Sequence, residues 1–74
     1  MAALFEFLIF MIVSKFTGIP VEKINDQTII PYRQLEDIII EIIASTGVYL
    51  PFTSETDVTV GQIVEEVKKT LTKK

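Results

Sequence analysis

The sequence contains no cysteine, no histidine and no tryptophan among its 74 residues. Without cysteine and histidine, the chain cannot form disulfides, thiolate or imidazole zinc sites, or Ser-His and Cys-His catalytic pairs. The groups left for proton transfer are carboxylates, two tyrosines and the lysines, and none of them stands in a recognisable catalytic motif. These absences argue against an enzyme, and we expect no metal site.

Basic residues are scarce in the middle of the chain. Residues 17–67 contain two basic side chains, Lys23 and Arg33, against nine acidic ones, which gives a net charge of −7, although the whole chain carries only −3. An acidic surface repels phosphate backbones and attracts basic patches on other proteins. The charge pattern therefore disfavours nucleic-acid binding and favours a basic protein partner, with a solvated acidic surface as the simpler alternative.

The chain also lacks an apolar run that is long enough to span a membrane. The apolar segment over residues 3–16 is interrupted by Glu6 and ends at Ser14 and Lys15, whereas a spanning helix needs about 20 apolar residues. The first six residues lack the positive charge that opens a secretory signal. We therefore expect a cytoplasmic protein without a transmembrane span, folded as a single domain over residues 1–74.

This apolar segment predicts a helix over residues 2–17, ended by Gly18 and followed by Pro20. Every position from Phe7 to Val13 is apolar, although a surface helix normally shows only one apolar stripe. The domain can bury one face of this helix, so the other face needs a second subunit, a partner or a lipid surface as cover. The alternative is a core helix whose outer face is unusually hydrophobic. The residues expected at a homodimer contact are Phe5, Ile9, Phe10 and Met11.

The next segment, residues 18–32, predicts an ordered loop rather than a helix or a strand. It contains one glycine, two prolines, an asparagine and an aspartate, which are residues typical of turns. A connection of this length is usually functional or tied down by buried apolar residues. The residues expected to pin the loop are Ile19, Val21, Ile24, Ile29 and Ile30.

The second half of the chain predicts three further helical segments. Apolar residues at helical spacing indicate a helix over residues 33–46 closed by Gly47, with a buried strand as the competing interpretation because three isoleucines are consecutive. A single helical turn is expected over residues 53–57, capped by Thr53 or Ser54. The last helix, within residues 59–71, begins with a predicted capping box between the first and fourth residues of this range, Thr59 and Gln62.

The order of these elements resembles that of the acyl carrier and peptidyl carrier proteins. The resemblance covers about residues 4–71 and rests on IPVEKINDQTII after the first helix, YLP before the short third helix, and DVTVGQIVEEV near the end. It implies an all-α, four-helix bundle with a long first loop and a short third helix, in which Ile29 and Ile30 plug the bundle. It also implies a place in fatty-acid or polyketide biosynthesis.

Carrier proteins begin their second helix with Asp-Ser-Leu, and the serine carries phosphopantetheine at a helix N-terminus that accommodates its phosphate. The matching residues here are Arg33, Gln34 and Leu35, so Gln34 stands at the place of the serine and cannot form the phosphodiester. Shifting the alignment puts Tyr32 or Arg33 there, while the serines lie at positions 14, 45 and 54. The resemblance therefore implies a carrier-like protein without its arm and without a cofactor, unless the alignment is wrong.

The same resemblance assigns partner docking to the acidic, outward side of the second helix. Two alternatives stay open, namely a working carrier modified at an unrecognised site and a helical interaction module that forms a homodimer. A small apolar ligand held among core residues such as Leu35, Ile39 and Ile63 is a further hypothesis. The residues expected to bind the basic surface of a partner enzyme are Arg33, Gln34, Glu36, Asp37, Ile40 and Glu41.

Overall fold

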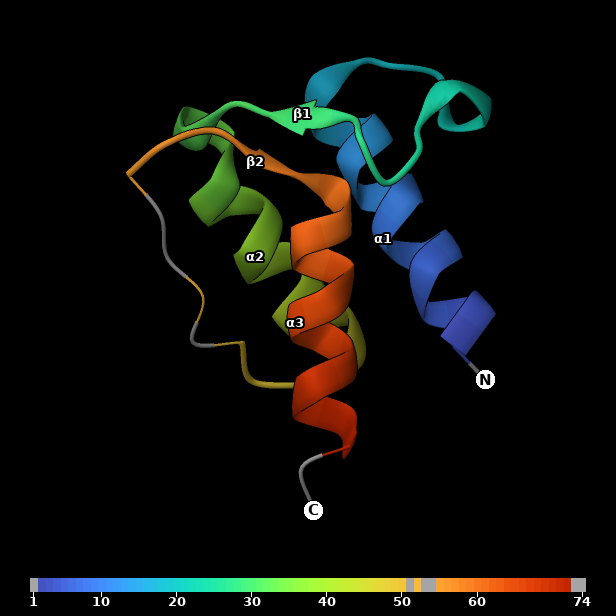
Figure 1. Cartoon of the computed structure of the whole chain (residues 1–74), viewed down its shortest axis with the longest axis vertical. Coiled ribbons are helices and arrows are strands. Elements are labelled where there is room, and N and C mark those ends of the chain that lie inside the picture. Colours follow the sequence, from blue (N-terminus) through green and yellow to red (C-terminus); the bar gives the residue numbers. More distant parts are fainter. Residues whose placement is uncertain (1, 51, 53–54, 73–74) are drawn as a thin grey trace.

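Three α-helices make up most of the part of the chain that the structure describes (Figure 1). The computed structural model describes residues 2–50, 52 and 55–72, and the side chains of residues 5–50, 52 and 55–71. The radius of gyration is 11.2 Å, close to the value of about 11 Å expected for a compact chain of this length. The elements in chain order are α1 (Ala2–Thr17), the 3-10 helix η1 (Val21–Lys23), β1 (Ile29–Ile30), α2 (Tyr32–Thr46), β2 (Val58–Thr59) and α3 (Val60–Thr72).

The bounds of the first two helices confirm the helices predicted there. α1 ends at Thr17, and α2 begins at Tyr32, one residue before its predicted start. Each helix is closed by a glycine with a positive φ, 79° at Gly18 and 72° at Gly47, a conformation that costs glycine little. The amide of each glycine donates a hydrogen bond to the carbonyl four residues earlier. The three consecutive isoleucines, residues 38–40, lie within α2, so the competing prediction of a buried strand was wrong.

The predicted capping box at the start of α3 is also confirmed. The Thr59 amide donates to Gln62 Oε1 at 2.8 Å, and the Gln62 amide donates to Thr59 Oγ1 at 3.2 Å. The two intervening amides donate to carbonyls of the loop before β1, Val60 to Thr28 and Gly61 to Asp26, each at 2.9 Å. Because these first amides have no partner inside a helix, the loop and the capping box together fix the start of α3.

The part of the chain that the structure describes holds three α-helices, where four were expected. The expected third helix, residues 53–57, falls partly on Thr53 and Ser54, which lie outside the described residues. Glu55 and Thr56 form a bend, and Asp57 leads into β2. The chain is extended here because Val58 pairs with β1, so the described residues do not form a clear four-helix bundle.

The segment predicted to be an ordered loop without a helix or a strand contains the 3-10 helix η1 and the strand β1. β1 pairs antiparallel with β2, with Ile29 opposite Thr59 and Ile30 opposite Val58. Because neighbouring residues of a strand point to opposite sides, Ile30 is fully buried while Ile29 is 54% exposed. The expectation that Ile29 is buried was therefore wrong. Ile24 and Ile30 are buried in the core and Ile19 packs against it, so these three of the expected residues fix the segment, whereas Val21 is half-buried outside the core cluster.

All buried core residues among the described side chains are branched aliphatic, and α1 packs against both α2 and α3. Among the described residues no polar or charged residue is buried, and the aromatic rings lie at the edge of the core or on the surface. Burial of such side chains, at about 1.5–3 kcal/mol each, is the main stabilising term. The buried residues are Ile9, Ile12, Val13, Ile24, Ile30, Leu35, Ile38, Ile39, Ile42, Leu50, Val58, Val60, Ile63, Val64 and Val67.

The residues expected at a homodimer contact fall on two different faces of α1. Ile9 is fully buried, and Phe5 and Phe10 are half-buried against the core, whereas Met11 is 49% exposed. Phe7, one turn before Met11, is 56% exposed although it was not among the expected residues. The placement of Ile9 at a contact with a second copy is therefore corrected, because its side chain is part of the core.

Gly61 lies in the first turn of α3, where we expect any larger residue to destabilise the protein. A Cβ added there would lie 3.0 Å from the carbonyl oxygen of Asp26 and 3.2 Å from its Cβ. Since a backbone oxygen cannot move aside easily, Gly61→Ala should lower the free energy of unfolding by about 1–3 kcal/mol, although alanine normally favours a helix. Urea unfolding measures the change.

The matched control is Glu65→Ala, an exposed position one turn later in α3. This substitution should change the free energy of unfolding by less than about 0.5 kcal/mol. If Gly61→Ala were as stable as the unaltered protein, the close approach between α3 and the loop before β1 would be contradicted.

Candidate functional site

The start of α2 is the place where the carrier resemblance puts the attachment site. Pro31 precedes the helix and offers no side-chain cap. Instead Asp57, which is 25 residues away in the sequence, accepts a hydrogen bond from the Tyr32 amide through Oδ1 at 3.0 Å. A carboxylate is stabilised at this end of a helix by unpaired amides and by the helix dipole. The anion-binding end of α2 therefore already holds a carboxylate of the chain itself.

Gln34 is half-buried and is bonded to α1. Its Nε2 donates to the carbonyl oxygen of Phe16 at 3.0 Å, while its Oε1 is buried and has no partner among the described residues. The Phe16 carbonyl belongs to the last turn of α1, where carbonyls need donors from outside their own helix. Gln34 thus ties the start of α2 to the end of α1, which distinguishes it from the exposed residues expected to dock a partner.

Tyr32 supplies the one hydroxyl within residues 31–37. The Ser14 hydroxyl donates to the carbonyl of Ile19 at 2.6 Å at the end of α1. Ser45 is exposed in the last turn of α2, and Ser54 lies outside the described residues. Neither of the two described serines is near the start of a helix, so shifting the alignment brings neither of them to the place of the attachment serine.

Four of the expected docking residues lie together on one exposed side of α2, and we call Arg33, Glu36, Asp37 and Ile40 the outer face of α2. Their spacing of three or four residues places them side by side, opposite the buried side of the helix. Ile40 lies among the charged residues and is 57% exposed. Within the described residues, no ion pair engages the carboxylates of Glu36 and Asp37.

Glu41, the remaining expected docking residue, lies at the boundary between α2 and α1. It is half-buried, and its Oε2 is 3.9 Å from the Nζ of Lys15. Lys15 Nζ also lies 5.8 Å from the ring centroid of Phe16. An exposed pair at this distance contributes at most about 1 kcal/mol. Glu41 therefore brings less unbalanced charge to a partner than Glu36 and Asp37 do.

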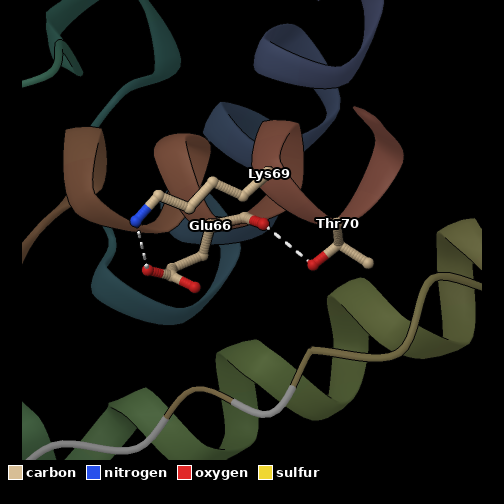
Figure 2. A network of polar contacts seen from close by, with 3 residues as sticks. All are labelled: Glu66, Lys69 and Thr70. Carbon is tan, nitrogen blue, oxygen red and sulfur yellow. Dashed lines mark hydrogen bonds and ion pairs between the residues drawn. The ribbon is translucent and has the colours of Figure 1, made fainter. Parts of the chain in front are cut away.

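A shallow groove lies between α3 and the segment before β2. Its volume is about 310 Å³, and it is lined by Phe52, Thr59, Gly61, Gln62, Glu65 and Glu66. Figure 2 shows Glu66 in contacts within its own helix: its carboxylate is 3.9 Å from Lys69 Nζ, and its backbone carbonyl accepts a 3.0 Å bond from the Thr70 hydroxyl.

The expected apolar-ligand residues are not in this groove. Leu35, Ile39 and Ile63 are each at most 6% exposed and pack in the core. None of the three lines the groove. The groove is therefore not the shelter for an acyl chain that the sequence suggested.

Nothing in the described part of the chain has the geometry of a metal centre or a membrane span. No group of three or more acidic side chains is close enough there to hold a metal ion. No helix of that part combines the length and the apolar character needed to cross a bilayer.

Comparisons with protein-family models, with curated proteins and with solved structures found no match for the chain. The carrier resemblance therefore stays a prediction from the quoted residues.

Asp57 is the residue of this site that sequence reasoning missed. Asp57→Ala removes the acceptor for the Tyr32 amide, so we expect the free energy of unfolding to fall by about 0.5–2 kcal/mol. Asp57→Asn keeps an oxygen that can accept this bond, and should retain most of the stability. Urea unfolding compares the two variants, and an unchanged stability of Asp57→Ala would contradict the role of Asp57 as a cap.

Proposed function

We propose that this protein is a non-catalytic, carrier-like docking module. In this proposal the outer face of α2 binds the basic surface of a partner enzyme, and no phosphopantetheine arm is attached. The single observation that carries the proposal is the exposed Ile40, held on a well-packed helix next to the unpaired carboxylates of Glu36 and Asp37.

The composition of the outer face of α2 supports a protein partner. A single exposed apolar residue is common on a protein surface, so the supporting feature is the position of Ile40, which is 57% exposed and lies on the same side of α2 as Glu36 and Asp37. Interfaces commonly have an apolar centre and a polar rim, and complementary charges guide association. The surface that fits best is an apolar pocket for Ile40 with lysine or arginine residues around it.

The start of α2 supports a role without the arm. Gln34 offers no hydroxyl, and its amide group is engaged with the Phe16 carbonyl. The carboxylate of Asp57 lies at the helix end that would have to accommodate the phosphate of the arm. Two negative groups at one helix end repel each other, so a phosphate would first have to displace Asp57.

The proposal retains the carrier order of elements, with α1, α2 and α3 in the places of the first, second and fourth helices. The short third helix of a carrier corresponds in sequence to residues 53–57, of which Glu55 and Thr56 form a bend. The bond from the Tyr32 amide to Asp57 holds the end of this segment at the start of α2.

One titration, with a broad-specificity phosphopantetheinyl transferase, tests docking and modification together. Every working carrier has to bind such an enzyme to receive its arm. We expect the amide NMR signals of residues 33–41 to shift on binding, and the binding to weaken as salt is raised. The double variant Glu36→Lys/Asp37→Lys should bind at least about tenfold more weakly, because like charges then face each other. Intact mass after incubation with coenzyme A should not change.

The matched control is Glu22→Lys/Glu65→Lys, which makes the same charge change at two exposed positions outside α2. This control should bind as the unaltered protein does. A mass gain of one phosphopantetheine would contradict the absence of the arm, and equal weakening in both double variants would contradict docking through the outer face of α2.

A further inference from the structure

The solvent side of α1 carries an apolar patch that no other part of the described chain covers. Phe7 is 56% exposed and Met11 is 49% exposed, and one helical turn separates them. Leu8 and Phe10 lie at the edges of this patch, half-buried, with part of each side chain packed against the core. We call Phe7, Leu8, Phe10 and Met11 the outer patch of α1. An apolar patch of this kind on a helix exposed to water marks a place of contact with another apolar surface.

The charges around this patch are balanced within the chain. No charged residue lies between Glu6 and Lys15 in the sequence. Glu6 pairs with Lys68 at 3.1 Å on one flank, and Lys15 lies 3.9 Å from Glu41 on the other. The patch is therefore electrically neutral, unlike the acidic remainder of the domain. A nucleic acid or a strongly charged protein surface would find no complementary charge here.

We propose that the outer patch of α1 binds the same patch of a second copy, forming a two-fold homodimer. A two-fold contact sets a surface against itself, so a neutral apolar patch meets a neutral apolar patch and no unbalanced acid is buried. A lipid surface fits less well, since helices that lie on membranes carry several basic residues along their polar flanks, whereas here Lys15 is already near Glu41.

The size of the contact sets the strength of this dimer. α1 has 16 residues and is therefore about 24 Å long. A seam between two helices of this length buries less than the roughly 800 Å² per partner that is typical of stable complexes. The dimer is therefore weak and depends on concentration.

Sedimentation equilibrium between about 10 µM and about 1 mM, a range suited to weak complexes, tests this proposal. We expect the mass to rise from one chain to two across the range. Met11→Glu should raise the dissociation constant at least about tenfold, because a charge would be buried at the contact, while Met11→Leu should leave it nearly unchanged. The matched control is Ile29→Glu, the same change in charge at a similarly exposed position on β1, outside both proposed surfaces.

Circular dichroism is used to check that each variant is folded. Phe7→Glu is a second variant at the patch. A single-chain mass of the unaltered protein at every concentration would overturn the proposal, as would equal weakening by Met11→Glu and Ile29→Glu. If the protein is monomeric and sediments with phosphatidylcholine vesicles, and the Met11→Glu variant does not, the patch binds a lipid surface instead of a second copy. None of these outcomes bears on docking through α2, which rests on different residues.

Discussion

The hydrogen bond from the Tyr32 amide to the Asp57 carboxylate is the contact on which the candidate functional site depends. Tyr32 begins α2 just after β1, and Asp57 directly precedes β2, so this bond lies next to the pair formed by Ile30 and Val58. The bond from Gln34 to the Phe16 carbonyl adds a second tie, to α1. Together these contacts fix the start of α2 relative to the helix before it and to the segment after it.

This arrangement changes what the start of α2 can do chemically. A helix N-terminus with open amides is suited to a phosphate, and a carrier protein places its arm at such an end. Here the carboxylate of Asp57 lies at this end, and the side chain of Gln34 is bonded to α1. The side chains of α2 that remain exposed to a partner include Glu36, Asp37 and Ile40. The molecule therefore has two exposed surfaces of different character. The outer face of α2 is acidic around Ile40, and the outer patch of α1 is apolar and neutral.

Features that depend on neighbouring residues were predictable from the sequence. The glycine that closes α2 and the capping box of Thr59 act within a few residues, and both were predicted. The pairing of β1 with β2 and the Asp57 cap join residues 25 or more positions apart, and no local pattern carries that information.

The faces of α1 were unpredictable for a different reason, because in a run where every residue is apolar the spacing does not tell Ile9 from Met11. Within the candidate site, the exposure of Arg33, Glu36, Asp37 and Ile40 was foreseen, and the inward bond of Gln34 was not.

The most direct test of the central claim, that Asp57 occupies the anion-binding end of α2, is an NMR titration with inorganic phosphate that follows the amides of residues 32–34. The account predicts no shift in the unaltered protein and a saturable shift in Asp57→Ala. A saturable shift in the unaltered protein would contradict it.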